Sequence, residues 1–181
     1  MKNKNIRMLT TAAMLLAAGV LLPQIFHLAG GAASGKVFLP MHIPVLLCGF
    51  ICGPFWGAAV GFICPVLSSA LTGMPQMFPT GFSQMGELAA YGIIAGLMYK
   101  LVMRTKWETV NIYTSLIAAM IVGRIVSGVI KLFLLMGSAN PLTWNAFISA
   151  ALLTAWPGIV IQLFVIPLLV GVYKKVSKSS L

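Results

Sequence analysis

Apolar runs of membrane-spanning length occupy most of this 181-residue sequence and leave little choice of fold. Hydrophobic residues make up 60% of the chain and charged residues only 8%, and the mean hydropathy is +1.00. A soluble domain of this size has too little interior to hide that much apolar surface from water. We therefore expect an all-α integral membrane protein, with residues 1–181 forming a single domain.

Six hydrophobic segments are separated by glycine, proline and charged residues, and we expect six transmembrane helices. The second and third segments are short for a full span. The sequence Gly53-Pro54 predicts a sharp turn between them, and Pro157 and Pro167 predict a kink in the sixth segment. The first segment is longer than the apolar core of a signal peptide, so we expect a mature helix. The approximate ranges are 8–28, 41–53, 55–72, 81–103, 112–136 and 144–173.

The basic residues predict the orientation. Nine of the 12 lysines and arginines fall within residues 1–7, 100–106 and 174–181. With an even number of spans these three clusters lie on one side, and loops rich in Lys and Arg are cytoplasmic. We expect both termini inside (N-in/C-in), basic cytoplasmic ends at 1–7 and 174–181, and a multi-pass protein of the bacterial cytoplasmic membrane. Charge gathered in loops in this way favours contact with membrane lipid and argues against a nucleic-acid partner.

Three ionisable residues fall inside the apolar segments: Glu87, Arg124 and Lys131. A charge within a bilayer costs at least about 2.5–3.5 kcal/mol, so it generally pairs with another group or serves a ligand pathway. Counted from the expected outer ends of their segments, Glu87 and Lys131 lie at a similar depth, about 9 Å down. Arg124 lies two turns deeper on the same helix face as Lys131. We predict that the three side chains line one outward-facing cavity.

Two interpretations of these charges are open. Glu87 and Arg124 can form a structural ion pair that holds two helices together, or all three side chains can hold a ligand. The chain has only two acidic residues, and the second, Glu108, lies at the inner hinge. The three side chains therefore sum to a net charge of +1, which favours an anionic ligand.

Further polar residues gather toward the outer half of the segments. Gln84 lies one turn before Glu87 and is expected to face the cavity. His42 opens the second segment and Asn145 the sixth, and both are candidate ligand contacts, although His42 can equally face lipid headgroups or water. We expect residues 76–78 to fold over the cavity as a lid.

Sequence motifs for enzymatic chemistry are absent. The chain has no P-loop, no HExxH, no GxSxG and no carboxylate cluster for a metal. Its three cysteines, Cys48, Cys52 and Cys64, match no zinc-site spacing and are expected to be buried apolar residues. We expect no enzyme activity, no metal and no cofactor, and any ATP-driven transport would need partner proteins.

Several stretches of the sequence resemble the substrate-binding S component of an energy-coupling factor (ECF) vitamin transporter. Ala13 and Ala17 have the small-residue spacing that lets two helices approach closely in lipid. This spacing resembles the family's docking motif for the transmembrane coupling subunit. The stretches 39–44, 53–57 and 71–75 resemble the second and third helices of the family and the loop that follows. The resemblance covers roughly residues 8–173.

This resemblance implies a function in micronutrient uptake. An S component binds a vitamin from outside and joins a transmembrane coupling subunit and two ATPase subunits, and toppling within the membrane then releases the ligand inside. Ala13 and Ala17 would face the coupling subunit. The positive cavity favours a small carboxylate, with pantothenate as the first choice. Folate, niacin, biotin, cobalamin and a queuosine precursor are alternatives within the family, and a structural or channel-like membrane protein is the alternative outside it.

Overall fold

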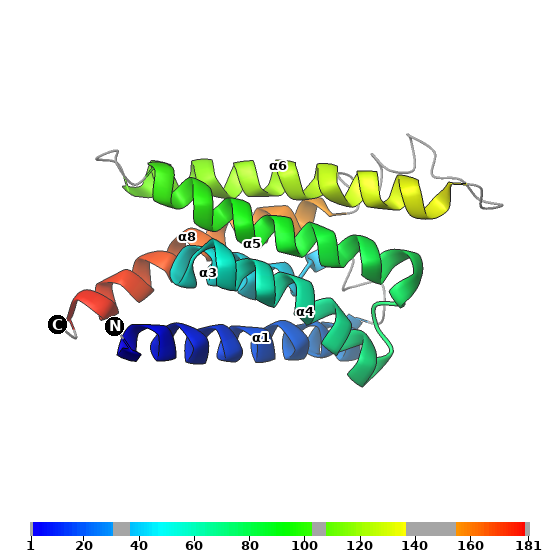
Figure 1. Ribbon diagram of the computed structural model, residues 1–181, viewed down its shortest axis with the longest axis horizontal. Coiled ribbons are helices and arrows are strands. Elements are labelled where there is room, and N and C mark those ends of the chain that lie inside the picture. Colours follow the sequence, from blue (N-terminus) through cyan, green and yellow to red (C-terminus); the bar gives the residue numbers. More distant parts are fainter. Residues whose placement is uncertain (1, 31–36, 103–107, 137–154, 180–181) are drawn as a thin grey trace.

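The computed structural model describes residues 2–30, 37–102, 108–136 and 155–179, and these residues contain six α-helices, one short π-helical segment and no strand (Figure 1). The expected all-α class is therefore confirmed. The elements are α1 (Lys2–Gly30), α3 (His42–Cys52), α4 (Pro54–Thr72), η1 (Met77–Gly81), α5 (Phe82–Val102), α6 (Glu108–Leu135) and α8 (Trp156–Ser179).

Four of the described helices, α1, α4, α6 and α8, are long and apolar enough to cross a membrane. Helix α5 has 21 residues, which is also the length of a span. Helix α3 has only 11 residues and extends about 16 Å at a rise of 1.5 Å per residue, roughly half of a hydrocarbon core. The second predicted segment is thus a short helix packed among its neighbours rather than a full span.

The ends of the first and last segments differ from the sequence-based expectation. Helix α1 begins at Lys2, because its basic first turns continue the helix beyond the apolar run. Helix α8 begins at Trp156, so Pro157 lies in the first turn, where the missing N–H leaves no helical hydrogen bond unmade. Pro167 lies inside the helix, whereas the kink at Pro157 stays a prediction because it depends on the residues before Ala155. Residues 144–154 of the predicted sixth segment lie outside the described residues.

The predicted turn between the second and third segments is present. Gly53 has a φ of +92°, a backbone conformation that side chains disfavour, and Pro54 begins α4 at a position where proline is tolerated. Farther along, α4 and α5 pack with their backbones in contact. A Cβ atom added to Gly92 would lie 2.2 Å from the carbonyl carbon of Gly57, so only glycine allows this approach.

Helix α5 occupies the middle of the bundle and packs against α3, α4 and α6, while α1 packs against α3 and α4. The apolar core runs through all six helices and includes the fully buried Leu46, Leu88, Leu116 and Ile166. Both chain termini lie at the same end of the bundle (Figure 1). This placement agrees with the two basic chain ends lying on one side of the membrane.

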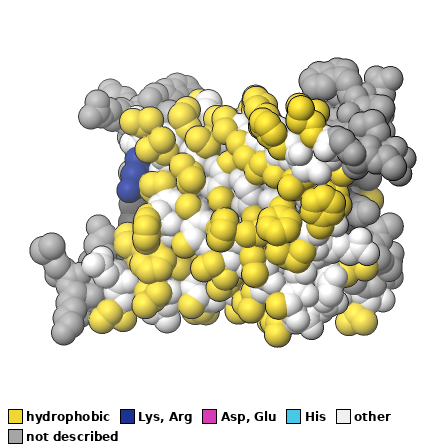
Figure 2. All heavy atoms as spheres, turned by 45° about the vertical axis from the view of Figure 1, so that its right-hand side comes forward, with side chains coloured by type: hydrophobic (Ala, Val, Ile, Leu, Met, Phe, Trp, Pro, Cys, Tyr) yellow, Lys and Arg dark blue, Asp and Glu magenta, His cyan; other side chains and the backbone are white. Residues whose placement is uncertain are grey.

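The outer surface of the helices is apolar. Figure 2 shows hydrophobic side chains over most of the described surface on one face, with Lys and Arg visible only at one edge. Large hydrophobic side chains such as Phe55, Phe133 and Phe164 are exposed on three different helices. A soluble protein rarely exposes a contiguous surface of this kind, whereas lipid chains cover it at no cost. The protein is accordingly a multi-pass membrane protein.

Candidate functional site

Glu87 lies at the centre of a buried polar cluster between three helices. Its side chain projects from α5 and the residue is only 5% exposed. One carboxylate oxygen, Oε1, lies 3.2 Å from Nη1 of Arg124 on α6 and 3.5 Å from Nε2 of His42 on α3. Because α5 packs against both α3 and α6, a carboxylate on its inner face meets one basic group from each side.

Two residues that the sequence did not single out complete the cluster. Ser127 is buried and its hydroxyl interacts with the Glu87 carboxylate. Tyr91 is 1% exposed, and its side chain interacts with both members of the Glu87–Arg124 pair. The Tyr91 ring also meets the His42 ring edge-on, with 5.1 Å between the ring centroids.

Helical spacing could have identified both of these residues. Tyr91 follows Glu87 by four positions and Ser127 follows Arg124 by three, so each shares a helix face with a buried charge. Space for the Tyr91 ring comes from Gly123 on α6. A Cβ atom at Gly123 would lie 2.3 Å from the ring, so any larger residue would displace the tyrosine.

Several polar atoms of this cluster are buried without a hydrogen-bond partner. The distances from Glu87 to Arg124 and His42 are those of ion pairs, but the atoms are not aligned as hydrogen bonds. Each unsatisfied buried donor or acceptor costs about 1–3 kcal/mol, so a cluster of them is a place where a polar ligand gains free energy. Among the described residues these atoms include His42 Nδ1, His42 Nε2, Glu87 Oε1 and Arg124 Nη2.

Gln84 and Lys131 lie next to this cluster on the same two helices. Both residues are partly buried. The side chain of Ile130 occupies the space beside Gly86, so residues 84–86 of α5 and 130–131 of α6 lie at one level of the bundle. The similar depth expected for Glu87 and Lys131 agrees with this packing. Asn145, the remaining candidate contact, lies outside the described residues.

The predicted lid residues 76–78 lead into the start of α5. The segment η1 contacts α4, α5 and α6. It lies at the end of the bundle opposite the chain termini (Figure 1). Hydrogen bonds hold the preceding turn, since the Ser68 hydroxyl donates to the carbonyl of Met74 at 2.8 Å and Gly81 N–H donates to the carbonyl of Gln76 at 2.8 Å. Phe78 is 59% exposed, so most of its side chain is not packed against the bundle.

Ala13 and Ala17 are both exposed on α1. The opposite face of this helix packs into the bundle through Ala12, Gly19 and Val20. The two alanines therefore form part of an outward surface on which a second helix can approach closely.

A second ionic group lies at the end of the bundle that carries the termini. Lys174 of α8 pairs with Glu108 of α6, and its Nζ atom lies 4.9 Å from the centroid of the Tyr99 ring. Both acidic residues of the chain are thus engaged with basic side chains. The cysteines Cys48, Cys52 and Cys64 are buried and free, and no cluster of three potential metal ligands occurs among the described residues.

A family model described as the substrate-specific component of ECF transporters matches residues 7–170, a range that includes the Glu87 cluster and both α1 alanines. No curated protein and no solved structure matches the chain significantly.

Proposed function

The chain belongs to the family of substrate-specific components of ECF transporters, and we propose that it captures a small vitamin carboxylate, with pantothenate as the first choice. Membership of the family means that the protein is the substrate-specific subunit of a transporter and works with an ECF module of coupling and ATPase subunits. We place its function in the bacterial cytoplasmic membrane, with the ligand entering from the outside.

The buried cluster around Glu87 is the observation that carries this proposal. Arg124 presents Nη1 to Glu87, while its second terminal nitrogen, Nη2, has no hydrogen-bond partner among the described residues. A guanidinium binds carboxylates well because its N–H groups form a planar fork. A ligand carboxylate beside Nη2 would satisfy this donor in a site shielded from water.

The charge of the region supports an anion. Glu87, Arg124 and Lys131 sum to +1, and this sum does not depend on which cation the carboxylate contacts. A monocarboxylate would bring the total to zero, which lowers the cost of holding charges inside the membrane. Gln84 and His42 would add hydrogen bonds to the polar groups of the ligand. Asn145 remains a candidate contact by sequence alone.

Uptake would then use two surfaces of the protein, one that closes over the bound ligand and one that docks against the coupling subunit. With the ligand bound, residues 76–78 and the exposed Phe78 would close over the outer end of the bundle. The α1 surface around Ala13 and Ala17 would dock against the coupling subunit, and two ATPases would drive release inside. Sequence motifs for ATP hydrolysis are absent from this chain, so the energy must come from those partners.

The unsatisfied nitrogens of His42 favour a second ligand class. Both ring nitrogens are buried without hydrogen bonds, and the opposite charges of Glu87 and Arg124 cancel each other. An uncharged heterocycle with adjacent donors and acceptors, as in a queuosine precursor, would satisfy these atoms without adding charge. Folate and biotin combine a carboxylate with such an edge, whereas niacin combines a carboxylate with a single acceptor nitrogen.

Mass spectrometry of small molecules retained by the purified protein tests the proposal. We expect a vitamin-sized carboxylate to be released from the wild-type protein, and a panel of vitamins to raise the thermal unfolding temperature by mass action. A retained uncharged heterocycle would replace the carboxylate proposal with the second one. If no micronutrient is retained or stabilising, the cluster is a structural staple between helices.

A further inference from the structure

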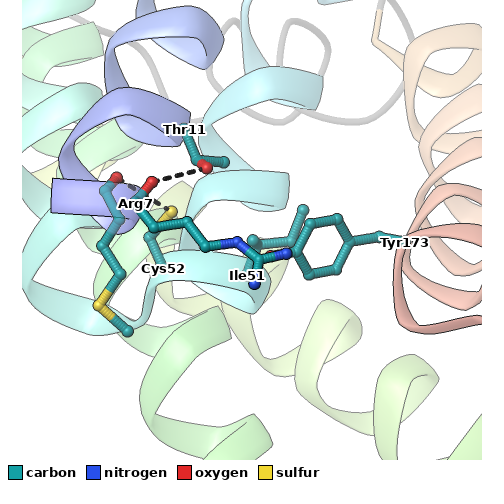
Figure 3. A pocket seen from close by; sticks show the side chains of 6 residues that line it. Arg7, Thr11, Ile51, Cys52 and Tyr173 are labelled. Atoms are coloured by element: carbon teal, nitrogen blue, oxygen red, sulfur yellow. Dashed lines mark hydrogen bonds between the residues drawn. The ribbon is translucent and has the colours of Figure 1, made fainter. Parts of the chain in front are cut away.

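A pocket lies at the end of the bundle that carries the chain termini, away from the Glu87 cluster. Its volume is about 180 Å³ (Figure 3). Helix α3 begins at His42, which belongs to the Glu87 cluster, and its last two residues, Ile51 and Cys52, line the pocket. The two sites are therefore about 14 Å apart along the helix axis. The lining residues are Arg7, Met8 and Thr11 of α1, Ile51 and Cys52 of α3, and Tyr173 of α8.

The pocket has an apolar wall and a polar rim. Met8 and Ile51 supply the wall, and both are partly buried. Arg7 extends from α1 across the pocket toward Tyr173, which projects from α8 on the other side (Figure 3). The Thr11 hydroxyl donates to the carbonyl of Arg7 at 2.9 Å, which fixes the turn that carries the guanidinium.

The guanidinium of Arg7 has no acidic partner within the described part of the chain. The only two acidic residues of the sequence are Glu87, which pairs with Arg124, and Glu108, which pairs with Lys174. Lys174 and Lys175 follow Tyr173 directly, so the surroundings of the pocket are cationic. The partner that best suits Arg7 is therefore an anion supplied from outside the chain.

We infer that this pocket binds the phosphate headgroup of an anionic phospholipid from the leaflet on the side of the termini. An arginine binds phosphate through paired N–H donors, and basic pockets between transmembrane helices on the cytoplasmic side suit anionic headgroups. A phospholipid fits better than a soluble anion because the wall is apolar and the flanking helix faces expose Leu9 and Val176 to acyl chains. The basic ends of the chain predict that this leaflet is cytoplasmic, where anionic lipids are concentrated.

Native mass spectrometry of the full-length protein in detergent tests this inference. The probes are dioleoyl-phosphatidylglycerol, its zwitterionic counterpart dioleoyl-phosphatidylcholine, and inorganic phosphate. We expect one phosphatidylglycerol to bind the wild type in preference to phosphatidylcholine. Arg7→Gln should weaken that binding about tenfold or more, because a charge-assisted hydrogen bond is lost. Arg7→Lys should retain part of the binding.

The matched control is Lys175→Gln, which removes a cation at the same membrane face but outside the pocket lining. We expect this change to weaken binding by no more than about fivefold, the effect of one surface charge. Equal weakening by Arg7→Gln and Lys175→Gln would overturn the inference in favour of general surface charge. Equal binding of phosphatidylcholine, or full displacement of the lipid by inorganic phosphate, would also overturn it. Because Arg7 lies far from Glu87, vitamin binding should be unchanged in Arg7→Gln, which separates this test from that of the proposed function.

Discussion

The carboxylate of Glu87 on α5 and the guanidinium of Arg124 on α6 lie 3.2 Å apart in the interior of the bundle. This contact joins two neighbouring helices and also orients Arg124, whose second terminal nitrogen is left for another acceptor. One pair can thus stabilise the fold and prepare a ligand site.

Removing one member of the pair should destabilise the protein strongly. Arg124→Ala leaves the Glu87 carboxylate buried without its cation, so the unfolding free energy in detergent should fall by about 3–5 kcal/mol. The double variant Glu87→Gln with Arg124→Gln should lose less, because no isolated charge remains. A thermodynamic double-mutant cycle that includes the single variants Glu87→Gln and Arg124→Gln measures the coupling. If the cost of the double variant equals the sum of the costs of the two single variants, the pair does not couple the two helices.

Lys131→Ala should weaken ligand binding. Lys131 is partly buried on α6, and the loss of its charge should weaken the binding of a carboxylate ligand by about tenfold. Lys100→Ala is the control, because Lys100 lies near Gly53 at the opposite end of the bundle. Equal ligand affinity in wild type and Lys131→Ala would argue against an anionic ligand, and equilibrium titration gives the answer.

The exposed face of α1 gives a prediction about transport. Ala13→Trp should block uptake in reconstituted vesicles with the complete transporter, because bulk at this position prevents close approach of a second helix. Ligand binding by the isolated subunit should be unchanged. Ile25→Trp serves as the control, since Ile25 is exposed farther along the same helix. Loss of both uptake and binding in Ala13→Trp would show that α1 has another role.

The contact between α4 and α5 should tolerate no side chain at Gly92. A Cβ atom there would lie 2.2 Å from backbone atoms of Gly57, so Gly92→Ala should lower the unfolding free energy by about 1–3 kcal/mol or more. Gly171 on α8 has no atom within 4 Å of the same added Cβ, and Gly171→Ala should be neutral or slightly stabilising. Similar thermal unfolding of both variants would mean that the two helices separate easily.

The sequence predicted the helical class and the main breaks because hydrophobic periodicity and Gly-Pro pairs act locally. The turn at Gly53-Pro54 is an example, since its geometry depends on two adjacent residues. The sequence did not predict that His42 contacts Glu87. The packing of the helices, and not the residue itself, decides whether a histidine faces a carboxylate or the lipid headgroups.

Isothermal titration of the purified protein can compare pantothenate with the uncharged alcohol in which its carboxylate is replaced. We expect pantothenate to bind and the alcohol to bind at least about tenfold more weakly, because a charge-assisted contact to Arg124 is lost. Equal binding of the two compounds, or no binding of either, would contradict the assignment of the Glu87–Arg124–His42 cluster as a site for this carboxylate.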